Sequence, residues 1–209
     1  MRFMIGDKRQ WEQNRRLYCG FSVMELLIVV SIFSMATVAI SATYINFTRL
    51  HRQVANAETL GEELRYISEL LVRSVRNNRI AYVTDPLPYT RDQLHLDNAS
   101  DQRISFAHID DADPVCNGLE VTTGCLGMYV EGVSTGYVPL TGYRIDIEDF
   151  VVYTTPVDDP FTPLSYGVYS SDRQPVVTIF IKATYLAANA RERVTMSLQT
   201  SVASRVYVR

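Results

Sequence analysis

Charge is missing from one long stretch of the chain. No Asp, Glu, Lys or Arg occurs in the 23 residues from Leu26 to Thr48, although the whole chain has 20 Lys and Arg and 23 Asp and Glu. As a helix this stretch would be roughly 35 Å long, at 1.5 Å per residue. The hydrocarbon core of a bilayer is about 30 Å thick. The stretch is therefore predicted to cross a membrane.

Proline is also missing from residues 21–85, and Gly61 is the only glycine among them. Proline and glycine are the residues that most often interrupt a helix, so one helix is predicted from Phe21 to about Arg79. After the apolar stretch, apolar and small residues recur at alternating steps of four and three, which predicts an amphipathic continuation of this helix. These residues are Leu50, Val54, Ala57, Gly61, Leu64, Ser68, Leu71 and Val75.

The common motifs of zinc proteases, P-loop proteins and C-x-x-C redox proteins are absent. A G-x-S-x-G match at residues 132–136 would make Ser134 a nucleophile, but such an elbow needs a following helix and a downstream His. The next residues lead toward another strand, and His51, His95 and His108 all precede Ser134. The match is interpreted as a turn, and no enzyme activity is predicted.

The acidic residues Asp110, Asp111 and Asp113 are the main candidates for a metal site. They lack the Gly and the distal Glu of an EF-hand loop. A solvated turn is therefore favoured over a calcium site, and the sequence predicts no metal ligands and no cofactor.

Basic residues gather at the N-terminus, where the first twenty residues contain five Lys and Arg against two acidic residues. By the positive-inside rule, this end stays in the cytoplasm. The remainder is net acidic and has no basic stripe that would neutralise phosphates. Direct nucleic-acid binding is therefore not predicted.

Three interpretations compete for the N-terminal region: a cleaved secretory signal, a plain single-pass anchor, or a leader peptide followed by a retained helix. A secretory signal has an apolar core of about 7 to 15 residues, which is shorter than the stretch found here. A plain anchor does not explain Glu25, directly before the apolar stretch, because a carboxylate inside a membrane costs about 2.5 to 3.5 kcal/mol. The third interpretation is therefore favoured.

Residues 19–30, with the sequence CGFSVMELLIVV, resemble the cleavage and methylation motif of type IV pilin-like proteins. In that family a basic leader ends in Gly and a prepilin peptidase cuts after it on the cytoplasmic side. The new first residue is often an N-methylated Phe, and the fifth mature residue is Glu. The resemblance implies cleavage between Gly20 and Phe21, methylation of Phe21, and a role for Glu25 in subunit assembly. Met24 stands where many members have a small or apolar residue such as Ile.

The charges at the new N-terminus give this motif a physical sense. Cleavage creates an amino group on Phe21, and residues four apart are neighbours on one helical face, so this amine and Glu25 could partly neutralise each other within one chain. The resemblance implies instead that Glu25 of an incoming subunit meets the Phe21 amine of its neighbour. That pairing would offset the cost of burying the carboxylate. The alternative is an interfacial Glu without a partner.

Beyond Pro88 the composition changes to β-branched residues, Tyr and turn residues, which favours strands. The last two candidate strands are expected to form a hairpin, and an antiparallel sheet packed against the long helix follows, which is an α+β fold. The candidate strands are Ile104–Ile109, Leu126–Val130, Tyr143–Ile147, Phe150–Thr154, Val176–Tyr185 and 194–204. The predicted segments are a leader (1–20), a transmembrane or filament-core helix (21–48), its amphipathic continuation (49–85) and a β-rich domain (86–209).

Of the three cysteines, Cys19 lies in the predicted leader, which leaves Cys116 and Cys125 in the part predicted to be exported. An oxidising compartment permits a disulfide, and the loop between these two contains turn residues that let its ends approach. A Cys116–Cys125 bond would contribute roughly 2 to 3 kcal/mol in the chain-entropy model. Two free thiols are the alternative, and export favours the bond.

The resemblance implies a structural subunit, a prepilin or pseudopilin of a type IV pilus or of a type II secretion-like filament. Its size and terminal strand look most like a minor pseudopilin of the J or W type. The implied partners are other pilin or pseudopilin subunits, the prepilin peptidase and N-methyltransferase, an inner-membrane assembly platform and the lipid bilayer. The implied location is the cytoplasmic (inner) membrane, with the C-terminal domain outside, and then the filament. The alternative is a single-pass membrane-anchored sensor or receptor, with an anchored hydrolase third.

Overall fold

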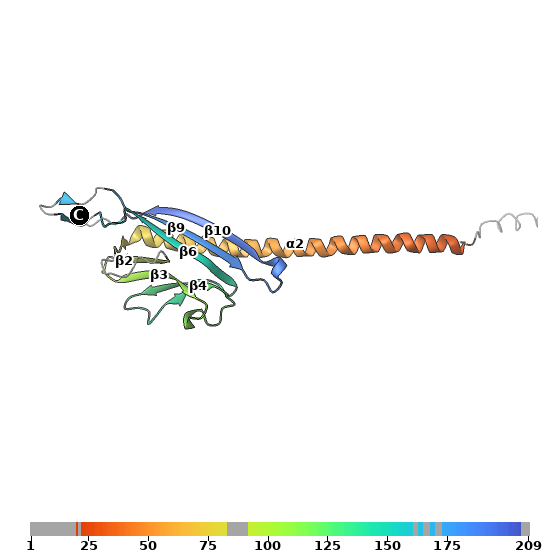
Figure 1. The fold of residues 1–209 in the computed structure, drawn as a ribbon, viewed down its shortest axis with the longest axis horizontal. Helices are drawn as coiled ribbons and strands as arrows, with labels where there is room; N and C mark the ends of the chain where they lie inside the picture. Colours follow the sequence, from red (N-terminus) through yellow and green to blue (C-terminus); the bar gives the residue numbers. More distant parts are fainter. Residues whose placement is uncertain are drawn as a thin grey trace, which may run out of the picture. The chain divides into compact units, whose positions relative to one another are not determined.

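The computed structural model describes residues 20, 22–82, 92–160, 163–164, 168–169 and 173–205. The chain divides into two compact units, with the boundary between Thr48 and Arg49. Helix α2, Val23–Asn77, contributes to both units, and all the strands that are described belong to the second unit (Figure 1). A long N-terminal helix followed by antiparallel sheets confirms the predicted α+β fold class.

Helix α2 is one uninterrupted element, as the scarcity of proline and glycine predicts. It ends at Asn77, slightly earlier than predicted, because the chain then turns into strand β1, Arg79–Ile80. The side-chain amide of Asn78 donates to the carbonyl of Ser74 at 2.8 Å and satisfies one of the free carbonyls at this end. Arg76 lies in the last turn, where the helix dipole favours a positive charge.

In the first unit, α2 exposes apolar side chains on all sides. Leu27, Phe33 and Ile40 are 60%, 71% and 70% exposed, respectively. Among the described residues, α2 is the one helix long and apolar enough to cross a membrane. An apolar surface of this extent in water would be a strong liability, and a bilayer or a set of apolar neighbours would remove it.

The serine and threonine side chains in this apolar stretch bond to their own helix. Each hydroxyl donates to a backbone carbonyl three or four residues earlier, at 2.7 to 3.0 Å, which removes its need for water. These residues are Ser31, Ser34, Thr37, Ser41, Thr43 and Thr48. The stretch can therefore enter an apolar environment without an unpaired hydroxyl at any of these positions.

In the second unit, α2 buries one stripe of side chains in the core. The buried residues are Leu60, Leu64, Ile67, Leu71 and Val75. The predicted stripe is right at Leu64, Leu71 and Val75 but wrong at its beginning, because Leu50 and Val54 are 60% and 55% exposed. In this unit the core covers α2 only after residues 50–54. The apolar side chains in that segment are therefore not buried, although they continue the predicted pattern.

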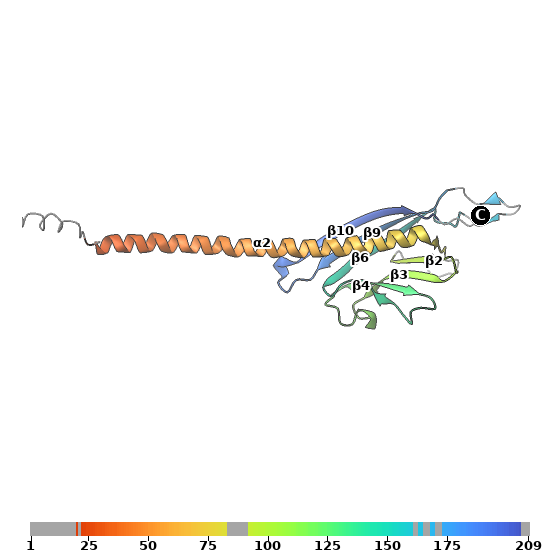
Figure 2. The same ribbon diagram turned by 180° about the vertical axis from the view of Figure 1, so that it is seen from behind.

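The strands of the second unit form two main sheets and a small hairpin (Figures 1 and 2). The five-stranded sheet has the order β1-β2-β3-β4-β5, and the three-stranded sheet has the order β10-β9-β6. The remaining bounds are β2 Gln93–Asp97, β3 Arg103–Asp110, β4 Gly124–Val130, β5 Val138–Pro139, β6 Ile145–Thr155, β9 Val176–Tyr185 and β10 Val194–Ala203, with the hairpin β7 Pro163–Leu164 and β8 Val168–Tyr169. Side chains from α2 and from both main sheets form one hydrophobic core.

The predicted hairpin of the last two strands is confirmed, with Val194 opposite Tyr185. The two strands predicted at 143–147 and 150–154 are wrong as separate elements, because they form the single strand β6. The register of β6 against β9 shifts between Ile147 and Asp149, which is a β-bulge. The bulge explains the apparent break in the alternating pattern, since one extra residue reverses which side chains face the core.

The connection between β9 and β10 holds α2 near the beginning of the second unit. The side-chain amide of Gln53 donates to the carbonyl of Arg191 at 2.5 Å, and that of Asn56 donates to the carbonyl of Glu192 at 3.0 Å. Arg52 also pairs with the Glu192 carboxylate at 3.6 Å. These contacts fix the position of residues 52–56 of α2 against the end of the three-stranded sheet.

Candidate functional site

The predicted processing site lies directly before the first turn of α2. Gly20 is exposed and outside the helix, and α2 begins at Val23. Ser22 supplies the helix cap, because its hydroxyl oxygen accepts from the Met24 N–H at 3.3 Å and its carbonyl accepts from the Leu26 N–H at 3.1 Å. Phe21, to which the cleavage, methylation and assembly predictions apply, lies outside the described residues.

Glu25 is an exposed acidic residue in the first turn of α2. A carboxylate there interacts favourably with the helix dipole and with free backbone N–H groups, by about 0.3 to 1 kcal/mol. Ser22 and Glu25 also have the S-x-x-E spacing of a capping box. Within the described part of the chain, no cation forms an ion pair with Glu25.

Cys116 and Cys125, the pair proposed from the sequence, are joined by a disulfide in the structure, with their Cα atoms 5.9 Å apart. Both side chains are buried, and they form a small apolar cluster with Ala107 and Ile109 beside the main core. The disulfide connects the short 3-10 helix Pro114–Cys116 to strand β4. It therefore fixes the loop between β3 and β4 to the sheet.

Asp146 is a buried carboxylate that the sequence did not single out. It is 2% exposed and lies at the start of β6. It accepts five hydrogen bonds, from the backbone N–H and the hydroxyl of both Thr122 and Thr123 and from the Gly124 N–H, at 2.5 to 3.2 Å. Burial alone would raise the pKa of this carboxyl, but these hydrogen bonds outweigh burial and hold the pKa below its ordinary value. Asp146 thus ties β6 to the segment that enters β4.

Replacing Asp146 with Asn is expected to lower the free energy of unfolding by about 2 to 3 kcal/mol at neutral pH, because the amide would turn a donor toward N–H groups. The contribution of Asp146 is fully present above its unfolded pKa of about 3.9, and it is lost as the pH falls through the lower folded pKa. The difference between the two proteins should therefore shrink in acid. Urea unfolding of both proteins, at neutral pH and below about pH 4, measures this difference in the free energy of unfolding.

A matched control for this measurement is Asp149→Asn, on the same strand. Asp149 is exposed, so its replacement should change the free energy of unfolding by less than about 0.5 kcal/mol. An Asp146→Asn protein that is as stable as the parent at neutral pH would contradict the role given to Asp146.

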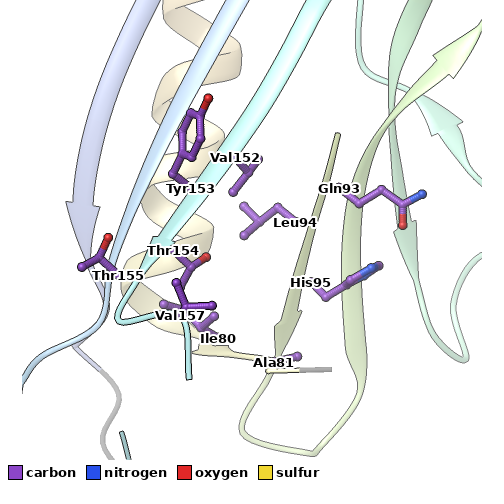
Figure 3. Close-up of a pocket in the computed structure, with 10 residues that line it drawn as sticks. All are labelled: Ile80, Ala81, Gln93, Leu94, His95, Val152, Tyr153, Thr154, Thr155 and Val157. Atoms are coloured by element: carbon purple, nitrogen blue, oxygen red, sulfur yellow. The ribbon is translucent and has the colours of Figure 1, made fainter. Parts of the chain in front are cut away.

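A pocket of about 340 Å³ lies between β2 and β6 (Figure 3). Figure 3 shows Leu94 and Val152 pointing toward each other across it, whereas His95 points away. His95 Nδ1 lies 2.8 Å from the hydroxyl of Ser105, and burial, together with nearby Arg103, lowers the pKa of His95 below its ordinary value. The described lining of the pocket therefore presents an apolar surface and no acid–base pair aimed into it.

The other motifs weighed in the sequence lie in turns. The hydroxyl of Ser134 donates to the carbonyl of Val130 at 3.0 Å and also accepts from its N–H at 2.8 Å. The segment after Ser134 leads into strand β5 and not into a helix. Asp113 caps the 3-10 helix by accepting from the Val115 N–H at 2.9 Å. Among the residues that the structure describes, no group of three or more His, Cys, Asp or Glu could hold a metal ion.

No family model, curated protein or solved structure matches the chain. The pilin-like assignment therefore depends on residues 19–30 and on the helix that follows them.

Proposed function

We propose that the chain is a prepilin or pseudopilin, a structural subunit of a type IV pilus or a type II secretion-like filament. One observation carries the proposal: Gly20, Phe21 and Glu25 have the spacing of a prepilin cleavage motif, directly before a long helix with an exposed apolar first part. Each feature has a physical role in this function. The leader is removed at an exposed site, the apolar helix packs in the membrane and then in the filament, and the folded domain is carried outside.

The start of α2 supports this proposal. A peptidase needs an extended segment around the bond that it cuts, and Ser22 caps the helix, so that Gly20 stays outside it. The apolar side chains of the first unit are exposed, and its serine and threonine hydroxyls from Ser31 to Thr48 donate to their own helix. Such a helix is suited to a bilayer. It is equally suited to an array of similar helices, where packed side chains and not water surround it.

A single-pass membrane-anchored sensor or receptor is the second candidate, since a membrane-spanning helix followed by a domain suits it as well. It gives no reason for a carboxylate at Glu25, which costs about 2.5 to 3.5 kcal/mol in a membrane unless it is paired. The filament gives that reason, because cleavage creates the amine of Phe21 as a partner. The filament subunit is therefore the proposal, and it predicts a changed N-terminus.

The mature protein is expected to begin at Phe21, with a methyl group on its amine and without residues 1–20. The measurement is the intact mass and N-terminal peptide of the protein extracted from the membrane of its own cells. An anchored sensor would keep its leader, so a protein that retains residues 1–20 in cells with an active prepilin peptidase would refute the proposed function.

A further inference from the structure

Two grooves of opposite charge lie along the part of α2 that belongs to the second unit. The acidic groove is lined by residues of α2 between 59 and 66 and by residues 140–142 of the loop between β5 and β6, and it has a volume of about 460 Å³. The basic groove, of about 470 Å³, is lined by residues of α2 between 68 and 77 and by Arg205. Every lining residue belongs to the second unit, so the spacing of the two grooves is set within one compact unit.

Two carboxylates line the acidic groove. Glu62 is exposed and Glu63 is half-buried, and neither forms an ion pair with another described residue. A Cβ atom at Gly142 would lie 3.0 Å from Glu63 Oε1, so this carboxylate lies against the loop that forms the other wall of the groove. Two negative charges in one groove favour a positively charged occupant.

Thr141 indicates that this occupant has hydrogen-bond donors. Its side chain lines the acidic groove and is 6% exposed, and its hydroxyl oxygen has no hydrogen-bond partner among the described residues. A buried polar atom is costly to leave unpaired. Tyr66, which also lines the groove and is 59% exposed, supplies an aromatic ring, and such rings attract guanidinium and ammonium groups. The acidic groove is therefore suited to an organic cation with N–H donors.

The basic groove presents such cations. Arg73, Arg76 and Arg205 line it together with Glu69, and all four side chains are exposed. None of these arginines forms an ion pair with a residue in the described part of the chain. A guanidinium group is planar and has five N–H donors, so it can bind a carboxylate through two parallel hydrogen bonds and a hydroxyl through a third. The two grooves are thus complementary in charge and in hydrogen bonding.

The two grooves cannot meet within one molecule. Glu62 and Arg73 are eleven residues apart on the same uninterrupted helix, which is roughly 16 Å at 1.5 Å per residue. A second copy, however, can place its basic groove against the acidic groove of the first. Such a contact joins two different surfaces, so it can repeat from copy to copy along a filament.

We propose that the acidic groove of one copy of the chain binds arginines of the basic groove of a second copy. The proposal rests on the proposed function, because the filament is what brings the copies together. A single exposed ion pair contributes little to stability. The contact therefore selects which surfaces of neighbouring copies meet, and the rest of the assembly supplies most of the binding free energy.

The test reverses the charge of each groove in the full chain, expressed with its normal partners. One variant carries Glu62→Lys with Glu63→Lys, a second carries Arg73→Glu with Arg76→Glu, and a third carries all four substitutions. The four sites are outside the core, so the chains should fold and lose residues 1–20 as the parent does. Each two-site variant is expected to be roughly tenfold less abundant in sheared filaments, which corresponds to about 1.4 kcal/mol of docking free energy.

The four-site variant identifies the partner. Exchanging the charges of both grooves restores their complementarity only if the partner is another copy of the same chain, so its abundance in filaments should return to near that of the parent. Glu58→Lys with Asp158→Lys is the control, because both residues are exposed and neither lines a groove. This control changes the net charge as Glu62→Lys with Glu63→Lys does, and it should be incorporated normally.

Three results would overturn the proposal. The first is equal incorporation of the parent and the two-site variants. The second is a loss that the four-site variant does not restore although every chain is processed and reaches the parent's level in the membrane, because that loss would assign the grooves to a non-identical partner. The third is a rise in the melting temperature of the extracted parent with calcium alone that Glu62→Lys with Glu63→Lys removes, because it would assign the acidic groove to a metal ion. Absence of the parent itself from filaments would instead overturn the proposed function, and this contact with it.

Discussion

Gly20→Leu is expected to abolish removal of residues 1–20, so that the protein keeps these residues. The resemblance to prepilins implies a peptidase that accepts glycine as the last leader residue, and a branched side chain would occupy the space that the enzyme needs for the backbone. We expect cleavage to slow by at least about 100-fold, which is roughly 2.7 kcal/mol of transition-state stabilisation. The intact mass of the membrane-extracted protein measures the outcome.

The substitution should leave the chain itself undisturbed. A Cβ atom at Gly20 meets nothing within 4 Å, so the structure has open space for the new side chain. Gly136→Leu is a matched control, because a Cβ atom there also meets nothing within 4 Å, but it lies in a turn of the second unit. The control should be processed as the parent is. Normal mature mass for Gly20→Leu would show that the cleavage site has been placed wrongly.

The helix was the most predictable part of the fold, because its causes are local. One glycine and no proline in this part of the chain predict an uninterrupted element close to the observed Val23–Asn77. Its buried face was less predictable. The periodic pattern began at Leu50, whereas burial begins at Leu60, a residue that the predicted stripe omitted. Periodicity indicates that one face of the helix is apolar. Which turns of that face are buried by the sheets depends on where the domain ends, and the periodicity does not contain that information.

The sheets show the same division between local and distant causes. Strands β9 and β10 were predicted almost to the residue, because their alternating β-branched and polar residues extend over ten positions. Strand β2 has the alternating sequence QLHLD, but it is short and was missed. The bulge in β6 was missed as well, since a single extra residue looks like a break between two strands.

The residues of the candidate site divide in a similar way. Gly20 and Glu25 were found because the motif is contiguous in sequence, and Cys116 and Cys125 because few cysteines offer few pairings. Asp146 was missed because its partners, residues 122–124, are about twenty positions away and donate mainly through their backbone. A carboxylate that binds main-chain N–H groups leaves no signature in the sequence.

Glu25→Ala is expected to yield a folded, processed and membrane-inserted subunit that does not enter the filament. The core of the second unit is built from residues 60 to 202, and none of its side chains is near Glu25 in sequence. Membrane insertion should not suffer, because the variant lacks the carboxylate whose burial costs about 2.5 to 3.5 kcal/mol. Docking should suffer, because the Phe21 amine loses its partner, and breaking a buried ion pair costs about 3 to 5 kcal/mol. We expect incorporation to fall at least about 100-fold.

Two conservative variants separate the charge of Glu25 from its place in the first turn of α2. Glu25→Gln keeps the size of the side chain and the spacing of a capping box, which accepts Glu or Gln at this position, but it removes the charge. If the carboxylate pairs with an amine, Gln should fail as Ala does. If Glu25 only stabilises the start of the helix, Gln should be incorporated almost normally. Glu58→Gln is the control, because Glu58 is an exposed carboxylate of α2 in the second unit.

The measurement expresses each variant beside its normal partners and first confirms by mass that the protein begins at Phe21, because peptidase action precedes docking. Abundance in sheared filaments is then compared with that of the unaltered protein. Failure of both Glu25 variants with normal incorporation of Glu58→Gln assigns the effect to the charge at this position. Undiminished incorporation of processed Glu25→Ala would show that the pairing is wrong, since a subunit that docks without this carboxylate needs no partner for the Phe21 amine.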